Sequence, residues 1–284
     1  MSNSYFFTHD IFNITKHKYK YFNKKIFTRQ TKKFILFGGE IKESWCIMQR
    51  YFVKEKQDNY LILDTSDIHH IKNVMRMNVG DKIECIYNKT LYICEILDLT
   101  SEKVKIIEEC PDNNESLYDV TIAVALVKEQ KMDLILQKLT ELGISKIIPV
   151  SMERSIVKLD NQKFTKKKER WIKICKEAAE QSKRNSIPEI TDIHTVKQLE
   201  NLSYNKKFIC STRNPENLVN NYLQNKESCA TMIFVIGPEG GISPKEEDLL
   251  ESFGYIPITL GNRIMRVETA AIYIASIINF CSNS

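Results

Sequence analysis

The stretch that decides the fold runs from Ala230 to Phe280 and reads ATMIFVIGPEGGISPKEEDLLESFGYIPITLGNRIMRVETAAIYIASIINF. Its first apolar run, Met232–Ile236, is typical of a strand buried on both faces of a parallel sheet. A second apolar run, Ile256–Leu260, stops equally sharply at a glycine. The pattern predicts two strands that each end in a glycine-containing loop, followed by a last apolar helix.

A helix is predicted between these two strands, and its start is well marked. Ser243 is a preferred N-cap residue, Pro244 suits the first helical position, and Glu246 completes a capping box. This order of elements is that of open α/β sheets, which bind ligands at the carboxyl ends of their strands. We therefore expect the functional site at the two glycine loops.

The composition is that of a folded protein: 43% of the 284 residues are hydrophobic, and the length suggests two domains. Eight cysteines are scattered without a CxxC pair, which favours buried or free thiols in a reducing compartment over a zinc site. The longest uncharged apolar run, Ala270–Phe280, is shorter than the ~20 residues of a membrane span. We expect a cytoplasmic protein without a membrane segment.

The first 47 residues differ from the rest of the chain. They hold nine basic and three acidic residues, whereas the remainder holds 32 and 33, so the charge of the whole chain gives no argument for nucleic-acid binding. A basic, acid-poor segment fits an organellar targeting peptide, although this one has few serines and a single arginine. A translation start placed too early explains it equally well. Residues 1–47 are interpreted as an extension outside the fold.

Residues 48–115 predict a small β-rich domain. Asn88-Lys89 reads as a hairpin turn, and the polar segment Cys110–Ser116 marks the boundary to the next domain. A helix is predicted at Asp67–Met77, and strands at Arg50–Val53, Tyr60–Leu63, Lys82–Tyr87, Leu91–Leu99 and Val104–Ile107.

In residues 116–284, strands and helices alternate, which predicts a parallel α/β sheet. Besides the stretch quoted first, strands are expected at Val120–Val127, Lys146–Val150 and Lys207–Cys210, and helices at Met132–Leu142, Arg170–Lys183, His194–Leu202 and Pro215–Gln224.

The loop Gly237-Pro238-Glu239-Gly240-Gly241 matches neither GxGxxG nor GxxxxGK[ST]. Glycines let backbone groups approach a flat ligand closely, and Leu260-Gly261 offers a second such edge. Each loop alone is explained as well by a structural turn. Together with Arg266, Glu268 and Thr269 before an apolar helix, they indicate a ligand site, although their spacing does not name the ligand.

Six blocks of sequence follow one another along residues 48–280. They are MQRYFV at 48–53, HHIKNVMR at 69–76, QKLTELG at 137–143, ERS at 153–155, EAAEQS at 177–182 with Arg184 and Pro188, and IGPEGG at 236–241 followed by LGNRIMRVETA at 260–270. In this order they closely resemble the motifs of the RsmE family, whose members are small-subunit rRNA uridine-N3 methyltransferases of the SPOUT superfamily.

The resemblance implies a PUA-like RNA-binding domain at 48–115 and a SPOUT methyltransferase domain with a deep trefoil knot at 116–284. Topology rules alone favour an unthreaded sheet. It also implies a homodimer, S-adenosylmethionine as methyl donor, and small-subunit rRNA rather than DNA or a membrane as partner. The implied cofactor-binding residues, acting largely through their backbone, are Ile236, Gly237, Pro238, Glu239, Gly240, Gly241, Leu260, Gly261, Ile264, Met265 and Thr269.

Three residues depart from the family pattern. Ile242 stands where an aromatic residue is common, so the position remains apolar. Met265 replaces a leucine of nearly the same size and shape. Val267 stands where a threonine is usual, which removes a hydroxyl group. If that hydroxyl orients the substrate in relatives, this chain does without it.

The implied reaction joins N3 of uracil to a methyl group on a sulfonium, and N3 must lose its proton. In-line positioning supplies ~7–11 kcal/mol, and a general base contributes about 10²–10⁴-fold. Arginine suits stabilisation of the deprotonated base, so the catalytic candidates are Arg266, Arg154 and Arg50. Glu268 is a candidate to orient Arg266 or to act as base. A carboxylate at the start of a helix also has a simpler role, because it interacts favourably with the helix dipole.

Other polar residues have simpler interpretations. Glu141 is read as a solvated or dimer-face carboxylate, and His69 and His70 as RNA-contacting or structural. Because the resemblance implies an RNA substrate, whose base must be extruded to reach the donor, the following basic run is a candidate for phosphate contact: Lys163, Lys166, Lys167, Lys168 and Arg170.

Three alternatives remain open at this point. Val267 favours an RNA-binding or ribosome-assembly module whose methylase site is inactive. A small-molecule enzyme with a nucleotide cofactor is disfavoured by the absence of GxGxxG and by the attached β-rich domain. A methyltransferase acting on another atom or another RNA would keep the same motifs.

Overall fold

The structure is a computed structural model, and it describes residues 33–37, 40–44, 48–111, 114–159, 161–213, 217–219, 222 and 231–283. The chain divides into two units, Met1–Met48 and Gln49–Ser284. In the first unit, β1 (Lys33–Phe37) and β2 (Glu40–Ser44) pair as an antiparallel hairpin. The helix predicted at Pro215–Gln224 lies mostly outside the described residues.

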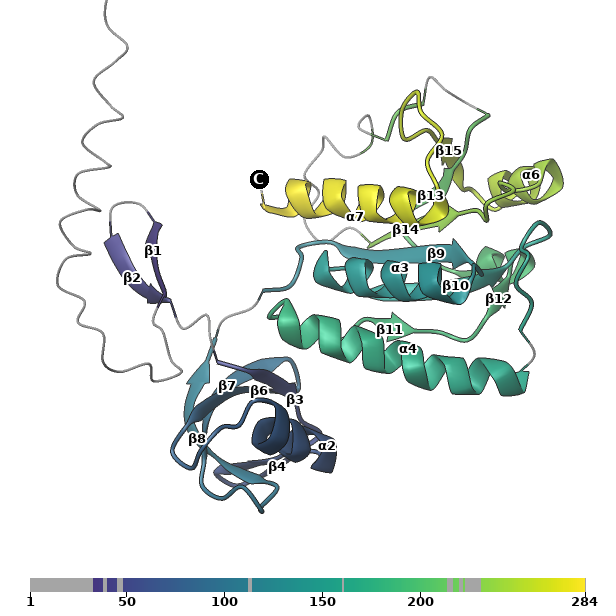
Figure 1. Cartoon of the computed structure of the whole chain (residues 1–284). Coiled ribbons are helices and arrows are strands. Elements are labelled where there is room, and N and C mark those ends of the chain that lie inside the picture. The colour runs from purple at the N-terminus through teal and green to yellow at the C-terminus, as the bar shows by residue number, and fades with distance from the viewer. Residues whose placement is uncertain are drawn as a thin grey trace, which may run out of the picture. The chain divides into compact units, whose positions relative to one another are not determined.

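The larger part of the second unit is a parallel sheet with the strand order β11-β10-β9-β14-β13-β15, and β12 also pairs with β10 (Figure 1). This confirms the predicted parallel α/β sheet. The strands are β9 (Asp119–Ala125), β10 (Lys146–Ser151), β11 (Glu189–Ile190), β12 (His194–Thr195), β13 (Lys206–Cys210), β14 (Thr231–Ile236) and β15 (Ile256–Ile258).

Helices cover both faces of this sheet. On the face seen in Figure 1, α3 (Glu129–Glu141), α4 (Asn161–Gln181) and α7 (Val267–Asn283) pack on alternate residues of β9, such as Ile122. On the other face, α6 (Pro244–Ser252) and the 3-10 helix η3 (Val196–Asn201) pack on the intervening residues, such as Ala123. The burial of β9 on both faces explains its continuous apolar run.

Two predicted helices differ from the observed elements. Helix α4 begins at Asn161 rather than at Arg170, because Phe164 and Trp171 face the core while lysines fill the positions between them. The segment 194–202 holds a short strand and a 3-10 helix, which starts at a capping box of Thr195 and Gln198. The predicted start of α6 is confirmed, with Ser243 accepting a hydrogen bond from the Glu246 amide.

The smaller part of the second unit is a six-stranded sheet with the order β3-β6-β7-β8-β5-β4, which encloses its own apolar core. The helix predicted at Asp67–Met77 begins and ends earlier than expected: α2 (Thr65–His69) continues into a π-helical turn, η2 (His70–Val74), and Arg76 has a φ of 50°. The strands are β3 (Arg50–Phe52), β4 (Glu55–Gln57), β5 (Tyr60–Ile62), β6 (Lys82–Tyr87), β7 (Thr90–Ile96) and β8 (Lys103–Cys110). The polar, exposed β4 has no apolar signal and was not predicted.

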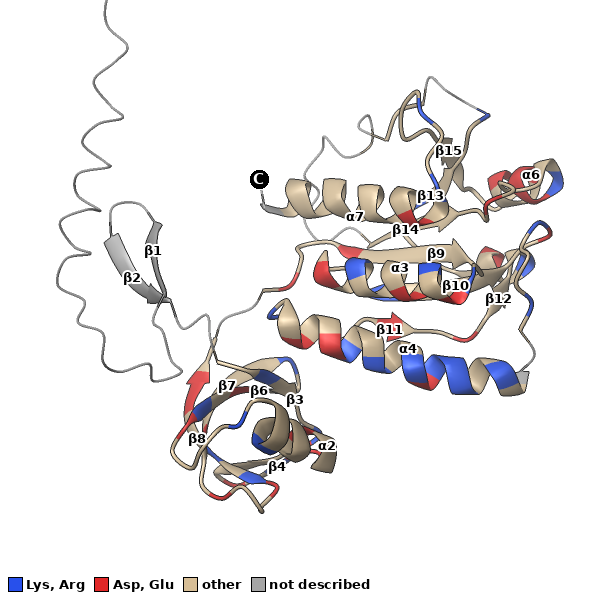
Figure 2. Cartoon of the chain, viewed as in Figure 1, with Lys and Arg blue, Asp and Glu red and all other residues tan. Residues whose placement is uncertain are grey.

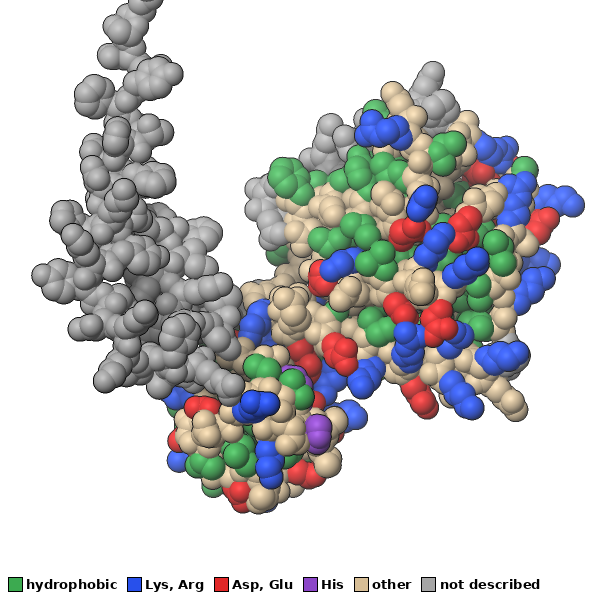
Figure 3. Space-filling model, in the orientation of Figure 1, with side chains coloured by type: hydrophobic (Ala, Val, Ile, Leu, Met, Phe, Trp, Pro, Cys, Tyr) green, Lys and Arg blue, Asp and Glu red, His purple; other side chains and the backbone are tan. Residues whose placement is uncertain are grey.

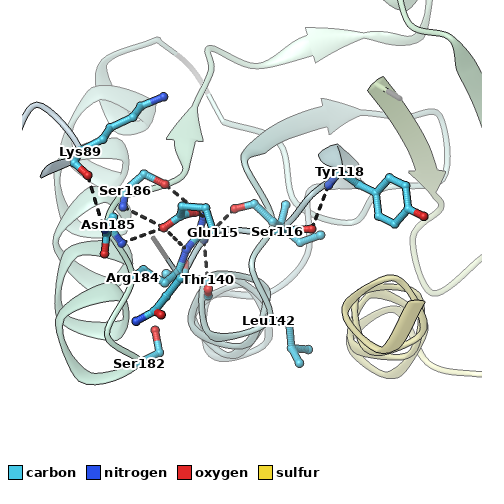
Figure 4. Close-up of polar contacts among 12 residues, drawn as sticks. Lys89, Glu115, Ser116, Tyr118, Thr140, Leu142, Ser182, Arg184, Asn185 and Ser186 are labelled. Atoms are coloured by element: carbon cyan, nitrogen blue, oxygen red, sulfur yellow. Dashed lines mark hydrogen bonds and ion pairs between the residues drawn. The ribbon is translucent and has the colours of Figure 1, made fainter. Parts of the chain in front are cut away.

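A polar network fixes the linker between the two parts to the end of α4 (Figure 4). Glu115 accepts hydrogen bonds from Arg184 Nη2 (2.6 Å) and from the amides of Asn185 (2.8 Å) and Ser186 (3.0 Å). Burial raises the pKa of Glu115, but Arg184 and the amides outweigh it and hold this pKa below its usual value. The buried Arg184 guanidinium also donates to the carbonyls of Thr140, in the last turn of α3, and of Ile144, just before β10.

A second contact joins α4 to α2. Lys176 donates to Asp67 (2.8 Å) and lies 3.6 Å from the carboxylate of Glu180, whose side chain is 14% exposed. Burial raises the pKa of Glu180 to about 7, and the ammonium of Lys176 opposes this shift only in part. The folded protein therefore holds a proton on Glu180 over a pH range in which the unfolded chain has lost it.

We expect Glu180→Gln to change how stability depends on pH. Between the ordinary glutamate pKa of 4.5 and about 7, the folded state binds more protons at Glu180 than the unfolded state, so stability falls as pH rises through this window. The variant lacks this loss and should be more stable than the parent at pH 8 by about 3 kcal/mol, since the pKa window spans about 2.5 units. Urea unfolding at pH 5 and pH 8 measures the effect, with the exposed Glu177→Gln as control. The same pH slope in parent and variant would contradict the assignment.

Candidate functional site

The first glycine loop follows β14 and folds tightly on itself. The Gly241 amide donates to the Pro238 carbonyl (2.8 Å), and Gly241 has a φ of +72°. A Cβ placed on Gly237 would lie 2.6 Å from Cγ1 of Ile242, so a side chain there would displace the loop. The loop conformation therefore requires glycine at both positions.

Arg154 packs against this loop. Arg154 follows β10, and only β9 lies between β10 and β14. Because these strands are parallel, the segment after β10 and the glycine loop after β14 lie at the same carboxyl edge of the sheet. Its Nη1 donates to the carbonyl of Gly240 (2.9 Å), and a Cβ on Gly240 would lie 3.3 Å from Cβ of Arg154. Arg154 is exposed apart from this contact, and the structure thus brings it to the predicted site.

The second glycine loop, which follows β15, is open. Gly261 has a φ of +113°, and a Cβ built on it meets no described atom within 4 Å. The backbones of Asn262, Arg263 and Ile264 make no hydrogen bond to another described residue, and Ile264 is 89% exposed. The loop therefore presents unpaired backbone groups beside an open surface, which fits a cofactor held by main-chain contacts.

One ammonium group connects the first loop to the start of α7. Lys131, in the first turn of α3, lies 2.7 Å from Oε1 of Glu239 in the first loop. It also lies 3.9 Å from Oε2 of Glu268, in the first turn of α7 just after the second loop. The hydrogen bond from Lys131 lowers the pKa of Glu239. Sequence reasoning missed Lys131, because a lysine in a polar run carries no signal for partners so distant in the chain.

The segment between the second loop and α7 holds the remaining candidates. Arg266 is exposed, and its carbonyl accepts the Ala270 amide (2.8 Å) at the start of α7. Glu268 lies beside Lys131 and forms no ion pair with Arg266 in the described part of the chain, so the expected orientation of Arg266 by Glu268 is not seen. Thr269 is exposed. Val267 is 4% exposed and belongs to the core, so its side chain serves packing.

Arg50 lies elsewhere. It is 2% exposed and donates to Glu84 (2.8 Å), to the Arg184 carbonyl (3.0 Å) and to Oδ1 of Asn185 (2.9 Å). Arg184 in turn binds the Ile144 carbonyl, just before β10, which places Arg50 at the amino edge of the sheet, opposite the glycine loops. The geometry of this chain makes Arg50 an anchor between the β-rich part and α4 rather than a partner for a reacting base.

The basic run expected to contact phosphate lies on the first half of α4 and is largely neutralised. Arg170 pairs with Glu129 and with Asp133 (2.6 Å), and Lys167 also pairs with Glu129 (3.1 Å). Figure 2 shows basic residues along α4 and acidic residues on the neighbouring α3. Lys168 pairs with Asp192, and Lys163 and Lys166 are exposed. Intramolecular pairing reduces the charge that this face offers to RNA.

Two of the other polar candidates, His70 and Glu141, have side-chain partners within the protein. Nδ1 of His70 lies 3.0 Å from the hydroxyl of Tyr51, whereas His69 is exposed. Glu141 accepts a hydrogen bond from Lys138 (2.8 Å). Among the residues that the structure describes, no group of three or more His, Cys, Asp or Glu could hold a metal ion. Within the same residues, no helix is long and apolar enough to cross a membrane.

Comparison with known proteins decides the family. Residues 113–279 match the RNA methyltransferase domain family, and residues 63–109 match the RNA methyltransferase PUA domain family. Ribosomal RNA small subunit methyltransferase E of Bacillus subtilis is 37% identical over 248 residues, which cover 82% of this chain and 96% of the relative. The chain belongs to the RsmE family.

Further relatives agree with this membership. The RsmE protein of Mesomycoplasma hyopneumoniae is 36% identical over 80% of this chain and 97% of its own length. The crystal structure of RsmE from Neisseria gonorrhoeae bound to S-adenosyl methionine has a TM-score of 0.73 at 28% identity, over 82% of this chain and 97% of its own. A Legionella pneumophila methyltransferase in complex with bound SAM reaches 0.75 at 29% identity, with the same coverage. Both glycine loops and Arg154 lie in the methyltransferase domain of this RsmE-family chain.

Proposed function

We propose that this chain transfers a methyl group from S-adenosylmethionine to N3 of a specific uridine in 16S rRNA, giving 3-methyluridine, and that it acts on the assembled small subunit. The observation that carries the proposal is the contact of Lys131 with Glu239 in the first glycine loop and with Glu268 just after the second, in a chain whose relatives are named ribosomal RNA small subunit methyltransferases. Two similar structures that contain S-adenosylmethionine support the choice of donor.

The residues at the two loops fit this donor. Residues 236–241 and 260–265, together with Thr269, would hold it, mainly through backbone groups that glycine leaves accessible. Ile236 is buried at the end of β14 and Met265 packs against the core, so these two side chains anchor the loops to the fold. When bound, the sulfonium donor supplies a methyl group that is already activated for transfer.

The chain's own residues then have two tasks. The exposed guanidinium of Arg266 is suited to stabilise negative charge on the deprotonated uracil, since it remains charged and is planar. Oε2 of Glu268 is buried and has no hydrogen-bond partner among the described residues, and the ammonium of Lys131 is 3.9 Å away. This oxygen is therefore suited to accept the proton of N3. Arg154 holds the first loop through the carbonyl of Gly240 and is the second arginine proposed for the site.

The finer architecture belongs to the same proposal. We propose an extension at 1–47, a PUA-like β-barrel domain at 48–115 and a knotted SPOUT domain at 116–284. A homodimer is supported by apolar side chains on α7, where Tyr273 is 37% and Phe280 72% exposed, and Figure 3 shows hydrophobic side chains gathering over this helix. The proposed location is the cytoplasm, with import into an organelle through residues 1–47 as the alternative.

The rival proposal is an RNA-binding module with an inactive methylase site. Val267 is the feature that favours it, but this side chain is buried in the core and serves packing. A methyltransferase for another atom or RNA keeps the same geometry and is separated only by identifying the product.

The full-length protein should label small ribosomal subunits that lack the modification. Subunits would be incubated with methyl-labelled S-adenosylmethionine, and the rRNA digested and analysed by mass spectrometry. We expect one uridine to gain a methyl group at N3. An inactive site predicts no labelling, and a label on a different atom or RNA would assign the third alternative.

A further inference from the structure

We propose that Lys131 is a positioning residue that clamps the first glycine loop to the start of α7. This inference rests on the proposed function and adds a residue to which neither glycine motif points. Lys131 is the side chain in contact with a carboxylate on each side of the site, Glu239 at 2.7 Å and Glu268 at 3.9 Å. The clamp therefore couples the loop that would hold the donor to the carboxylate that would receive the uracil proton.

The contact with Glu239 fixes the first loop. Lys131 and Glu239 are each 30% exposed, so their hydrogen bond lies at the rim of the site rather than in the core. A half-exposed pair of this kind adds little to the stability of a fold. Its position, between a glycine loop and the first turn of α3, points to control of loop geometry instead.

The contact with Glu268 has a different character. At 3.9 Å the ammonium attracts the carboxylate but is too far away for a hydrogen bond. Oε2 of Glu268 is buried and keeps its capacity to accept a hydrogen bond. Lys131 thus holds the Glu268 carboxylate in place without occupying the oxygen that the reaction would use.

The clamp also has an electrostatic role. One ammonium lies between two carboxylates, Glu239 and Glu268. Lys131 therefore limits the repulsion between these two carboxylates and allows both to stay beside the site.

The test compares Lys131→Met, which removes the charge but keeps the length of the stem, with Lys131→Arg, which restores the charge. Lys146→Met is the matched control, because Lys146 forms a similar half-exposed ion pair with Glu189 (3.0 Å) at the opposite edge of the sheet. Glu239→Gln opens the same clamp from the loop side and is informative if Lys131→Met folds poorly. Thermal unfolding of each variant establishes that it is folded.

Two measurements carry the test. Calorimetry with S-adenosylmethionine should show about tenfold weaker binding for Lys131→Met and for Glu239→Gln, with Lys146→Met within about twofold of the parent. At saturating donor, single-turnover methyl transfer should fall a further about 30-fold in Lys131→Met and recover in Lys131→Arg. Because Lys131 acts through Glu268, Lys131→Met combined with Glu268→Gln should be no slower than Glu268→Gln alone.

Equal behaviour of Lys131→Met and Lys146→Met in both measurements would overturn the proposal. Rate losses that multiply in the double variant would overturn the route through Glu268. If the parent protein binds the donor but labels no ribosomal subunit, the proposed function fails, and the binding measurement still decides whether the clamp exists.

Discussion

Arg266→Ala is expected to slow methyl transfer by about 10²–10³-fold while changing small-subunit binding by less than about threefold. Arg266 is exposed directly before α7, and its side chain makes no ion pair with a described residue, so its charge is available to a substrate. Stabilisation of a deprotonated base acts mainly in the transition state, which is why turnover should respond far more than binding.

Single-turnover labelling with saturating subunits measures the first effect, and filter binding of labelled subunits measures the second. Arg213→Ala is the matched control, because it removes an exposed arginine that pairs with Asp248 (2.9 Å) on α6. Equal losses of transfer and binding would give Arg266 a role in RNA retention alone. Unchanged transfer would remove it from the reaction.

The second large effect is expected for Gly261→Ala, which should weaken binding of S-adenosylmethionine by about 100-fold or more. Gly261 has a φ of +113°, and the space that its Cβ would enter is open in the described structure. An added methyl group therefore meets no described protein atom, and the obstruction would be felt by a ligand held against the loop backbone.

Gly254→Ala separates ligand obstruction from backbone strain. Gly254 also has a positive φ (+82°) and open space at its Cβ, but it lies at the end of α6. Both substitutions should lower the stability by a similar amount, on the order of 1–3 kcal/mol, since each forces alanine into a sparsely populated conformation. Calorimetry should show that Gly254→Ala still binds the donor, and equal affinities in the two variants would place the donor away from Gly261.

Much of the fold could be predicted because its signals are local. The buried strands of the parallel sheet read as continuous apolar runs, and the capping box at Ser243 fixed the start of α6. The start of α4 was misplaced because lysines between Phe164 and Trp171 hide the apolar period. The π-helical turn at His70–Val74 has no sequence pattern that distinguishes it from an ordinary α-helix.

The site could be predicted only in part, because its key contacts join residues far apart in the chain. The glycine loops were found from their composition, whereas Lys131 depends on partners in a loop and a helix near the other end of the domain. Motif resemblance also could not distinguish a catalytic arginine from an anchor. Arg50 belongs to a family block, yet its buried partners, Glu84 and Asn185, show a structural task.

A crystal structure of the full chain with S-adenosylmethionine tests the central claim most directly. We predict that the donor lies between residues 236–241 and 260–265, in hydrogen-bond contact with the backbone of the second loop, and that its methyl group points toward the side chains of Arg266 and Glu268. A donor bound elsewhere, or two glycine loops filled by the protein's own side chains, would contradict the account.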